Sequence, residues 1–354
     1  MSDSDIGTQL QEQVKAAVAT ATPLCITAGN SKSFYGRAPV GERIDLSGHS
    51  GIVSYEPTEL VITARAGTPL RDIEQTLADN NQMLAFEPPH FGPTATLGGT
   101  IACNLSGPRR PYTGAARDFV LGTRIINGKG EILRFGGEVM KNVAGYDVSR
   151  LMTGALGTLG VLLDISLKVL PRPEAELTLA QHTSAQQALD RMHALSHLPL
   201  PVSASLFDGD TLFVRLSGTA RGVDAARDRV GGDEVRQDSE LWSRVKEHQH
   251  DFFAAQQPLW RLSLASTTAP LSIEGQWLYE WGGAQRWLLG ESDARVVRSL
   301  AQAHGGHATL YRGDPQRDQV FHPLPDGLMT LHRRLKQAFD PHGIFNPGRM
   351  YREL

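Results

Sequence analysis

The stretch PPHFGPTATLGGTIACNLSGPRR, from Pro88 to Arg110, predicts more about the fold than any other part of the sequence. Its two adjacent glycines allow the backbone to approach a planar or phosphorylated ligand closely. A structural glycine turn beside a solvated basic pair is the alternative, but it explains fewer of these features together. We therefore expect a ligand-cradling segment, in which Arg109 and Arg110 balance negative charge on a cofactor or substrate. Its candidate binding residues are Pro88, Thr96, Gly98, Gly99, Asn104, Ser106 and Gly107.

Glycine is concentrated around this stretch. Residues 92–160 contain 14 of the 36 glycines in a chain of 354 residues. Disorder would also raise the glycine content, but here the glycines alternate with apolar runs at 119–121 and 125–126. The excess therefore indicates turns and close approach to a ligand.

A second candidate segment follows a short strand predicted at 23–27. A strand that ends in small residues can present successive backbone N–H groups to a diphosphate, and serine hydroxyls add further donors. The segment has neither the Gly-Lys-Ser/Thr of a P-loop nor the Gly-x-Gly-x-x-Gly of a Rossmann turn. An ordinary turn is the alternative interpretation. The candidate binding residues are Ala28, Gly29, Asn30, Ser31, Lys32 and Ser33.

A third candidate segment is LMTGALGTLGVL, residues 151–162. Its glycines recur at every third position, which indicates close contacts rather than a long stable helix. A tight turn that leads into a core strand explains this pattern equally well. If the segment does bind a ligand, the candidates for contact with an adenine or ribose edge are Gly160, Val161 and Leu162.

Composition excludes several classes of function. With 35 basic and 38 acidic side chains the net charge is -3, which gives no electrostatic case for binding nucleic acid. Cys25 and Cys103 are too few for a disulfide framework or a cysteine-ligated iron–sulfur cluster, and we expect both to be small buried residues. We interpret His304 and His307 as loop histidines, so no metal site is expected. The chain has no long apolar run and no signal-peptide pattern, which predicts a soluble cytoplasmic protein.

The order of predicted elements indicates an α+β fold with two domains. A β-hairpin is expected over 117–135, and a strand over 161–170 that ends at the run Pro171-Arg172-Pro173. This proline-rich run is the best domain boundary in the sequence. Thr68 is the expected N-cap of a helix that runs to about Asn80. Further helices are expected at 9–20, 184–197, 221–230, 291–304 and 325–339, and further strands at 202–207 and 211–216.

Four parts of the sequence, residues 23–37, 86–122, 141–170 and 345–349, together resemble the FAD-binding half of the vanillyl-alcohol oxidase/p-cresol methylhydroxylase (PCMH) flavoprotein superfamily. The resemblance implies FAD as the cofactor. Many members of this superfamily attach the flavin to a histidine in the first loop, but residues 28–36 contain none, so non-covalent FAD is expected. The implied domains are a PCMH-type FAD-binding domain of two α/β subdomains at 1–173, a smaller α+β cap or substrate domain at 174–339, and a C-terminal segment at 340–354 that returns to the FAD domain.

A narrower resemblance is to the FAD-binding E subunits of bacterial glycolate oxidases. It is carried by Glu87-Pro88-Pro89-His90, Gly107-Pro108-Arg109-Arg110-Pro111, the stretch GGEVMKNVAGYD at 136–147, and the closing residues 345–351. This resemblance implies that glycolate, a 2-hydroxy acid, is oxidised to glyoxylate in a complex. The implied partners are a paralogous flavin-binding D subunit and an iron–sulfur subunit that receives the electrons. The implied location is the cytoplasm, with peripheral attachment to the inner membrane through the complex.

The related 2-hydroxy-acid dehydrogenases, the D subunit included, carry a His-x-Gly-Asp-Gly-Asn stretch that this sequence lacks. Two alternatives to the subunit therefore stay open. One is a stand-alone FAD-dependent dehydrogenase that acts on a 2-hydroxy acid or an alcohol, and the other is an assembly module without flavin. The catalytic residues are unknown at this stage, with Arg109 and Arg110 as the candidates.

Overall fold

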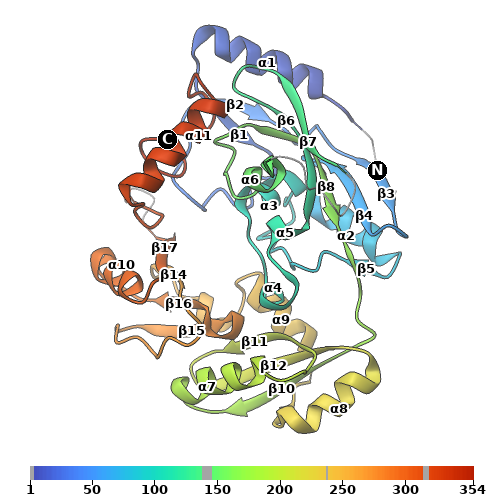
Figure 1. The fold of residues 1–354 in the computed structure, drawn as a ribbon, viewed down its shortest axis with the longest axis vertical. Coiled ribbons are helices and arrows are strands. Elements are labelled where there is room, and N and C mark those ends of the chain that lie inside the picture. Colours follow the sequence, from blue (N-terminus) through green and yellow to red (C-terminus); the bar gives the residue numbers. More distant parts are fainter. Residues whose placement is uncertain (1–3, 138–145, 237, 314–318) are drawn as a thin grey trace. The chain divides into compact units, whose positions relative to one another are not determined.

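The computed structural model describes residues 4–137, 146–236, 238–313 and 319–354 (Figure 1). Helices and sheets occur throughout, which confirms the predicted α+β class. The chain forms two compact units: unit 1 comprises 1–105, 115–171 and 323–354, and unit 2 comprises 106–114 and 172–322. These units differ from the ranges expected from the sequence in two places. Residues 106–114 belong with the second unit, and the closing segment of the first unit begins at 323 rather than at 340.

Unit 1 contains a two-stranded parallel sheet, β1-β2, and a five-stranded antiparallel sheet in the order β3-β4-β8-β6-β7. The central strand β8 is buried along nearly its whole length, as is its neighbour β4, so both faces of the sheet are covered there. A separate two-stranded sheet is formed by the short strands β5 and β9. The strands are β1 Leu24–Thr27, β2 Glu42–Asp45, β3 Ile52–Glu56, β4 Val61–Arg65, β5 Gln82–Met83, β6 Val120–Ile126, β7 Ile132–Gly136, β8 Val161–Lys168 and β9 Leu170–Pro171.

The helices of unit 1 share one hydrophobic core with these strands. In α1, the buried apolar residues Leu10, Val14 and Ala17 recur at the spacing of one helix face. The same spacing buries one face of α2. The helices are α1 Gly7–Thr20, α2 Leu70–Ala78, α3 Leu97–Cys103, α5 Ala116–Phe119, α6 Val148–Met152 and α11 Asp326–Phe339.

Unit 2 is built on an eight-stranded antiparallel sheet in the order β13-β10-β12-β11-β15-β16-β14-β17. One apolar cluster joins α7 and α8 to the β10-β12-β11 part, and a second joins α10 to the β14-β17 part. The strands are β10 Ala175–His182, β11 Val202–Phe207, β12 Thr211–Gly218, β13 Asp233–Glu234, β14 Leu259–Ser263, β15 Gln276–Glu280, β16 Gln285–Leu289 and β17 His307–Arg312. The helices are α4 Arg110–Thr113, α7 Ala185–Ser196, α8 Ala220–Val230, α9 Asp238–Lys246 and α10 Ala294–Ala303, with short 3₁₀ turns at Asp251–Phe253 and Trp281–Gly283.

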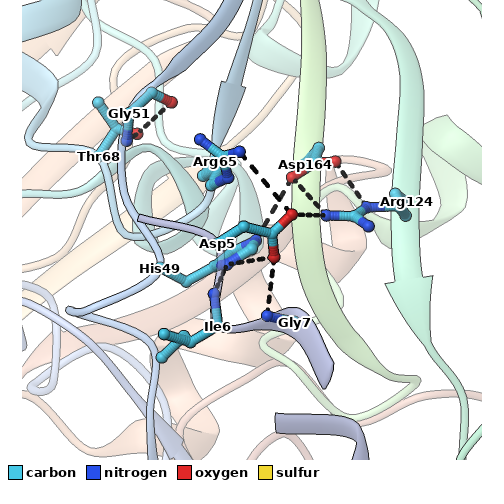
Figure 2. A network of polar contacts seen from close by, with 9 residues as sticks. All are labelled: Asp5, Ile6, Gly7, His49, Gly51, Arg65, Thr68, Arg124 and Asp164. Atoms are coloured by element: carbon cyan, nitrogen blue, oxygen red, sulfur yellow. Dashed lines mark hydrogen bonds and ion pairs between the residues drawn. The ribbon is translucent and has the colours of Figure 1, made fainter. Parts of the chain in front are cut away.

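A polar network fixes the N-terminal segment to the larger sheet of unit 1 (Figure 2). The carboxylate of Asp5 lies 3.3 Å from Arg124 and 3.7 Å from Arg65. Arg124 also holds Asp164 on β8, with 2.6 Å between its Nε and the carboxylate. Burial raises the pKa of Asp164, but hydrogen bonds from His49 and Arg124 outweigh the burial, so the pKa is lowered overall. The network therefore depends on ionised carboxylates.

The structure confirms the predicted hairpin, because β6 pairs with β7 across the turn at 127–130. It corrects the predicted helix cap, since Thr68 makes no capping hydrogen bond to α2. The Thr68 hydroxyl instead accepts the N–H of Gly51 at 2.9 Å and donates to the Gly51 carbonyl at 3.1 Å (Figure 2). The Thr68 side chain therefore bonds to Gly51, which is distant in the sequence, instead of to the first turn of α2. Residues 138–145 of the quoted stretch GGEVMKNVAGYD lie outside the described residues.

Candidate functional site

Unit 1 contains a pocket of about 220 Å³ whose wall comes from segments far apart in the sequence. Pockets that enclose drug-sized ligands measure roughly 300–1,000 Å³, so this one suits part of a dinucleotide. Among its lining residues are eight of those predicted from the sequence: Ala28, Gly29, Asn30, Ser31, Lys32, Ser33, Thr96 and Gly99. It also includes residues that the sequence analysis did not select as binding residues, among them Pro39, Ala102, Leu156, Asn346 and Arg349.

The loop after β1 offers backbone donors at this pocket. Among the described residues, the N–H groups of Gly29, Asn30 and Ser31 have no protein acceptor. The Gly29 carbonyl, in contrast, accepts the hydroxyl of Thr94 at 2.5 Å, which fixes the loop. Asn30 has a left-handed backbone, with φ at 56°. Successive N–H groups in a turn of mixed hand form an anion-binding concavity, so the loop fits a diphosphate.

Different physical causes explain why glycine occupies each of the positions around the pocket. A Cβ on Gly29 would lie 1.5 Å from a backbone carbonyl oxygen across the loop, and one on Gly98 would lie 2.7 Å from the Cβ of Ala66. Protein packing therefore requires both of these glycines. A Cβ on Gly99 would meet only the Oγ1 of Thr96, at 3.3 Å. This contact is tight, but apart from chain neighbours and the backbone of the same helix, no other heavy atom lies within 4 Å of that position, as expected where a ligand approaches the backbone.

The C-terminal segment extends the β1-β2 sheet. The N–H of Leu24 donates to the Ile344 carbonyl at 2.7 Å, and the N–H of Asn346 donates to the Leu24 carbonyl at 2.9 Å. The Asn346 side chain accepts the N–H of Ile26 at 2.8 Å and donates to the Leu156 carbonyl at 2.7 Å. Asn346 therefore links the strand that carries the diphosphate-binding loop to the turn before β8.

A buried ion pair holds the same segment at the end of α11. Lys336 is 9% exposed and lies 2.8 Å from the carboxylate of Asp340, which is 1% exposed. The Lys336 ammonium also donates to the carbonyls of Thr158 and Phe345, at 2.8 and 2.7 Å. Burial lowers the pKa of Lys336, and the Asp340 charge opposes this shift. Lys336 thus joins the glycine turn before β8 to the C-terminal segment.

Two buried basic side chains lie in the pocket wall. Lys32 donates from its ammonium group to the His90 carbonyl at 3.2 Å. Arg349 donates to the carbonyls of Arg37 and Ser33, at 2.6 and 3.1 Å. Positive side chains beside a concavity of N–H groups suit an anionic ligand.

Both cysteines line this pocket, and neither forms a disulfide. Burial raises the pKa of the Cys103 thiol, although the charges of Lys32 and Arg349 oppose the shift. Cys103 is therefore a neutral thiol near pH 7, and the thiol is a far weaker nucleophile than the thiolate.

The other predicted residues of unit 1 lie outside the residues that line this pocket. Pro88 is buried and lies in the loop that connects β5 to α3. Asn104 is the C-cap of α3, with φ at 51°. Gly160 precedes β8, whose first residues Val161 and Leu162 pair with β6.

Four further predicted residues, Ser106, Gly107, Arg109 and Arg110, belong to unit 2. Arg109 forms an ion pair with Glu176, and the Arg110 guanidinium lies 4.4 Å from the ring centroid of Trp281. The Trp281 indole donates to the Gly107 carbonyl at 3.1 Å. These contacts engage both arginines with protein groups of unit 2, whereas the sequence predicts that they balance charge on a cofactor or substrate.

His307 lies past the end of α10, as predicted, but it begins the strand β17 rather than lying in a loop. His304 follows α10, one residue beyond its end, whereas the predicted helix over 291–304 included it. In the described ranges, no group of three or more His, Cys, Asp or Glu side chains is arranged to hold a metal ion. No helix in those ranges is both long enough and apolar enough to cross a membrane.

Comparisons with known proteins identify the class of protein to which this chain belongs. The family model of the FAD binding domain matches residues 8–136, and that of the C-terminal domain of FAD linked oxidases matches residues 317–350. The solved structure of 4-ethylphenol oxidase from Gulosibacter chungangensis, in its isoeugenol complex, has a TM-score of 0.73 at 14% identity, covering 99% of this chain and 88% of that chain. The chain is therefore an FAD-linked oxidoreductase with the PCMH-type fold.

Closer relatives narrow the assignment. The glycolate oxidase subunit GlcE of Escherichia coli K12 is 49% identical over 352 residues, which is 99% of each chain. The glycolate oxidase subunit GlcD of Bacillus subtilis is 30% identical over 168 residues, covering 46% of this chain and 35% of GlcD. The chain belongs to the family of glycolate oxidase E subunits, and FAD is its cofactor. The N–H groups of the loop after β1, which have no protein acceptor among the described residues, and the uncrowded side of Gly99 fit this cofactor.

Proposed function

We propose that this chain is the FAD-binding subunit of a multi-subunit glycolate oxidase, which oxidises glycolate to glyoxylate and passes the electrons to an iron–sulfur subunit. The similarity to the Escherichia coli subunit over the full length of both chains is the observation that carries this proposal. The similarity of nearly half the chain to GlcD supports a paralogous flavin-binding partner. Two cysteines are too few to ligate a cluster, which supports an electron acceptor on another subunit.

In this proposal the pocket of unit 1 holds the diphosphate part of FAD without a covalent bond. The N–H groups of Gly29, Asn30 and Ser31 donate to phosphate oxygens, and Gly99 leaves room for close approach to the backbone. When bound, the flavin supplies a hydride acceptor that can release electrons one at a time. The protein's own part is to fix the loops, through Asn346 and the other contacts of the C-terminal segment.

Co-purification with the D and iron–sulfur subunits, followed by a flavin count on each chain, tests this function. We expect FAD on this chain, and glyoxylate formation that requires all three subunits. Reduction of an artificial dye by the isolated chain with a 2-hydroxy acid would instead favour a stand-alone dehydrogenase. Full activity of a complex in which this chain has no flavin would favour an assembly module.

We also propose a cytoplasmic location, with membrane attachment only through the complex. The motivation is the low cysteine content, which suits a reducing compartment, and the near balance of 35 basic and 38 acidic side chains, which gives no electrostatic case for binding an anionic membrane surface. Cell fractionation with and without the partner subunits checks this. Membrane association of the chain expressed alone would contradict it.

A further inference from the structure

Arg349 is a buried cation of unit 1 that has no protein counter-charge among the described residues. The residue as a whole is 8% exposed, and its guanidinium donates to two backbone carbonyls, those of Arg37 and Ser33. In the part of the chain that the structure describes, no carboxylate forms an ion pair with it. Lys336 is buried to a similar degree in the same unit, but it has the carboxylate of Asp340. The two buried cations therefore differ in whether a protein carboxylate balances their charge.

A buried charge without an opposite charge is costly, since it has lost water and gained no partner. Burial lowers the pKa of Arg349, as expected of such a site. A guanidinium nevertheless stays protonated in proteins. The positive charge is therefore permanent, and a bound anion would compensate it.

The surroundings of Arg349 indicate what that anion is. Arg349 lines the same pocket as Gly29, Asn30 and Ser31, whose N–H groups have no protein acceptor. Its hydrogen bond to Ser33 reaches the end of that loop. The N–H of Arg37 also donates to the Arg349 carbonyl at 3.0 Å, so main chain and side chain both hold the loop.

We propose that Arg349 is a further FAD-binding residue, whose charge pairs with the cofactor diphosphate while its hydrogen bonds hold the loop after β1 in its binding conformation. This inference rests on the proposed placement of FAD in the pocket of unit 1, and it adds a residue from the far end of the chain to that site. It also gives the C-terminal segment a role in cofactor affinity rather than only in folding.

The experiment measures the dissociation constant of FAD for the flavin-free chain by titration, in wild type, Arg349→Gln and Arg349→Lys. Gln keeps N–H donors for the loop carbonyls and removes the charge, whereas Lys keeps the charge and loses the fork of donors. We expect Gln to weaken FAD binding about 10- to 100-fold, the effect of losing one charged hydrogen-bonding group, and Lys to recover part of that loss. The control is Arg352→Gln, because Arg352 is an exposed arginine three residues further on, and it should bind FAD like wild type.

Thermal unfolding without FAD accompanies the titrations, so that a folding defect is recognised. An Arg349→Gln chain that binds FAD within about twofold of wild type would overturn the inference, since less than half a kcal/mol would then separate them. An Arg349→Lys chain that binds more weakly than Arg349→Gln would overturn the charge role as well. A wild-type chain that binds no FAD would contradict the proposed function itself, which is a different result from either.

Discussion

Replacing Lys336 with methionine removes the cation of the buried pair and keeps a side chain of similar length. The carboxylate of Asp340 stays buried, and its remaining donors among the described residues are the N–H groups of Ile344 and Phe345, at 3.1 and 2.8 Å. The carbonyls of Thr158 and Phe345 lose their ammonium donor at the same time. Breaking a buried pair by removing one partner costs about 3–5 kcal/mol. Unit 1 has about 190 residues, so its Tm should fall by roughly 6–20 °C.

Calorimetric unfolding of the FAD-free chain measures this change. The matched control is Lys15→Met on α1, because the Lys15 side chain is 48% exposed and should change stability by less than about 0.5 kcal/mol. The double variant Lys336→Met/Asp340→Asn should cost less than the sum of its two single variants, since it leaves no lone buried charge. A Lys336→Met chain within about 1 kcal/mol of wild type would refute the argument that this pair fastens the C-terminal segment.

Two further predictions concern unit 1. The pKa of Asp164 is lowered in the folded chain, so the stability from its network is present above the unfolded value of about 4 and lost as the pH falls through the folded pKa. Asp164→Asn should therefore flatten the dependence of Tm on pH in acid, and an unchanged acid profile would contradict the network. Gly29→Ala places a Cβ 1.5 Å from the Thr94 carbonyl oxygen and should lower both Tm and FAD affinity. Gly99→Ala meets only the Thr96 hydroxyl, at 3.3 Å, so it should lower Tm far less than Gly29→Ala while it weakens FAD binding in a flavin titration. Equal loss of Tm in both glycine variants would show that Gly99 is needed only for folding.

The sequence was informative where a site is local. The loop at 28–33 was recognised because strand, small residues and hydroxyls follow one another, and the structure places these residues in one pocket with Thr96 and Gly99. The closing residues 345–349 contributed to the family resemblance, but their role required the tertiary pairing of residues 344–346 with β1. No local pattern shows that Asn346 bonds to Ile26 across 320 positions.

Other features depend on partners that the sequence does not reveal. Arg109 and Arg110 looked available for a cofactor or substrate, and their contacts with Glu176 and Trp281 appear only in the folded unit. The glycine content of residues 92–160 indicates ligand approach, yet in this range Gly98 is required by packing against Ala66 and Gly128 by packing against the backbone of Asp340. The glycine excess therefore marks a region of close chain packing that also surrounds the binding pocket.

The central claim is that this chain binds FAD non-covalently in the pocket of unit 1, and the flavin content of the purified chain tests it most directly. The account predicts a yellow protein, or one that becomes yellow on reconstitution, which releases stoichiometric FAD when it is denatured. It also predicts that Arg349→Gln lowers the occupancy at limiting FAD. A wild-type chain that stays without flavin absorbance in excess FAD would contradict the account.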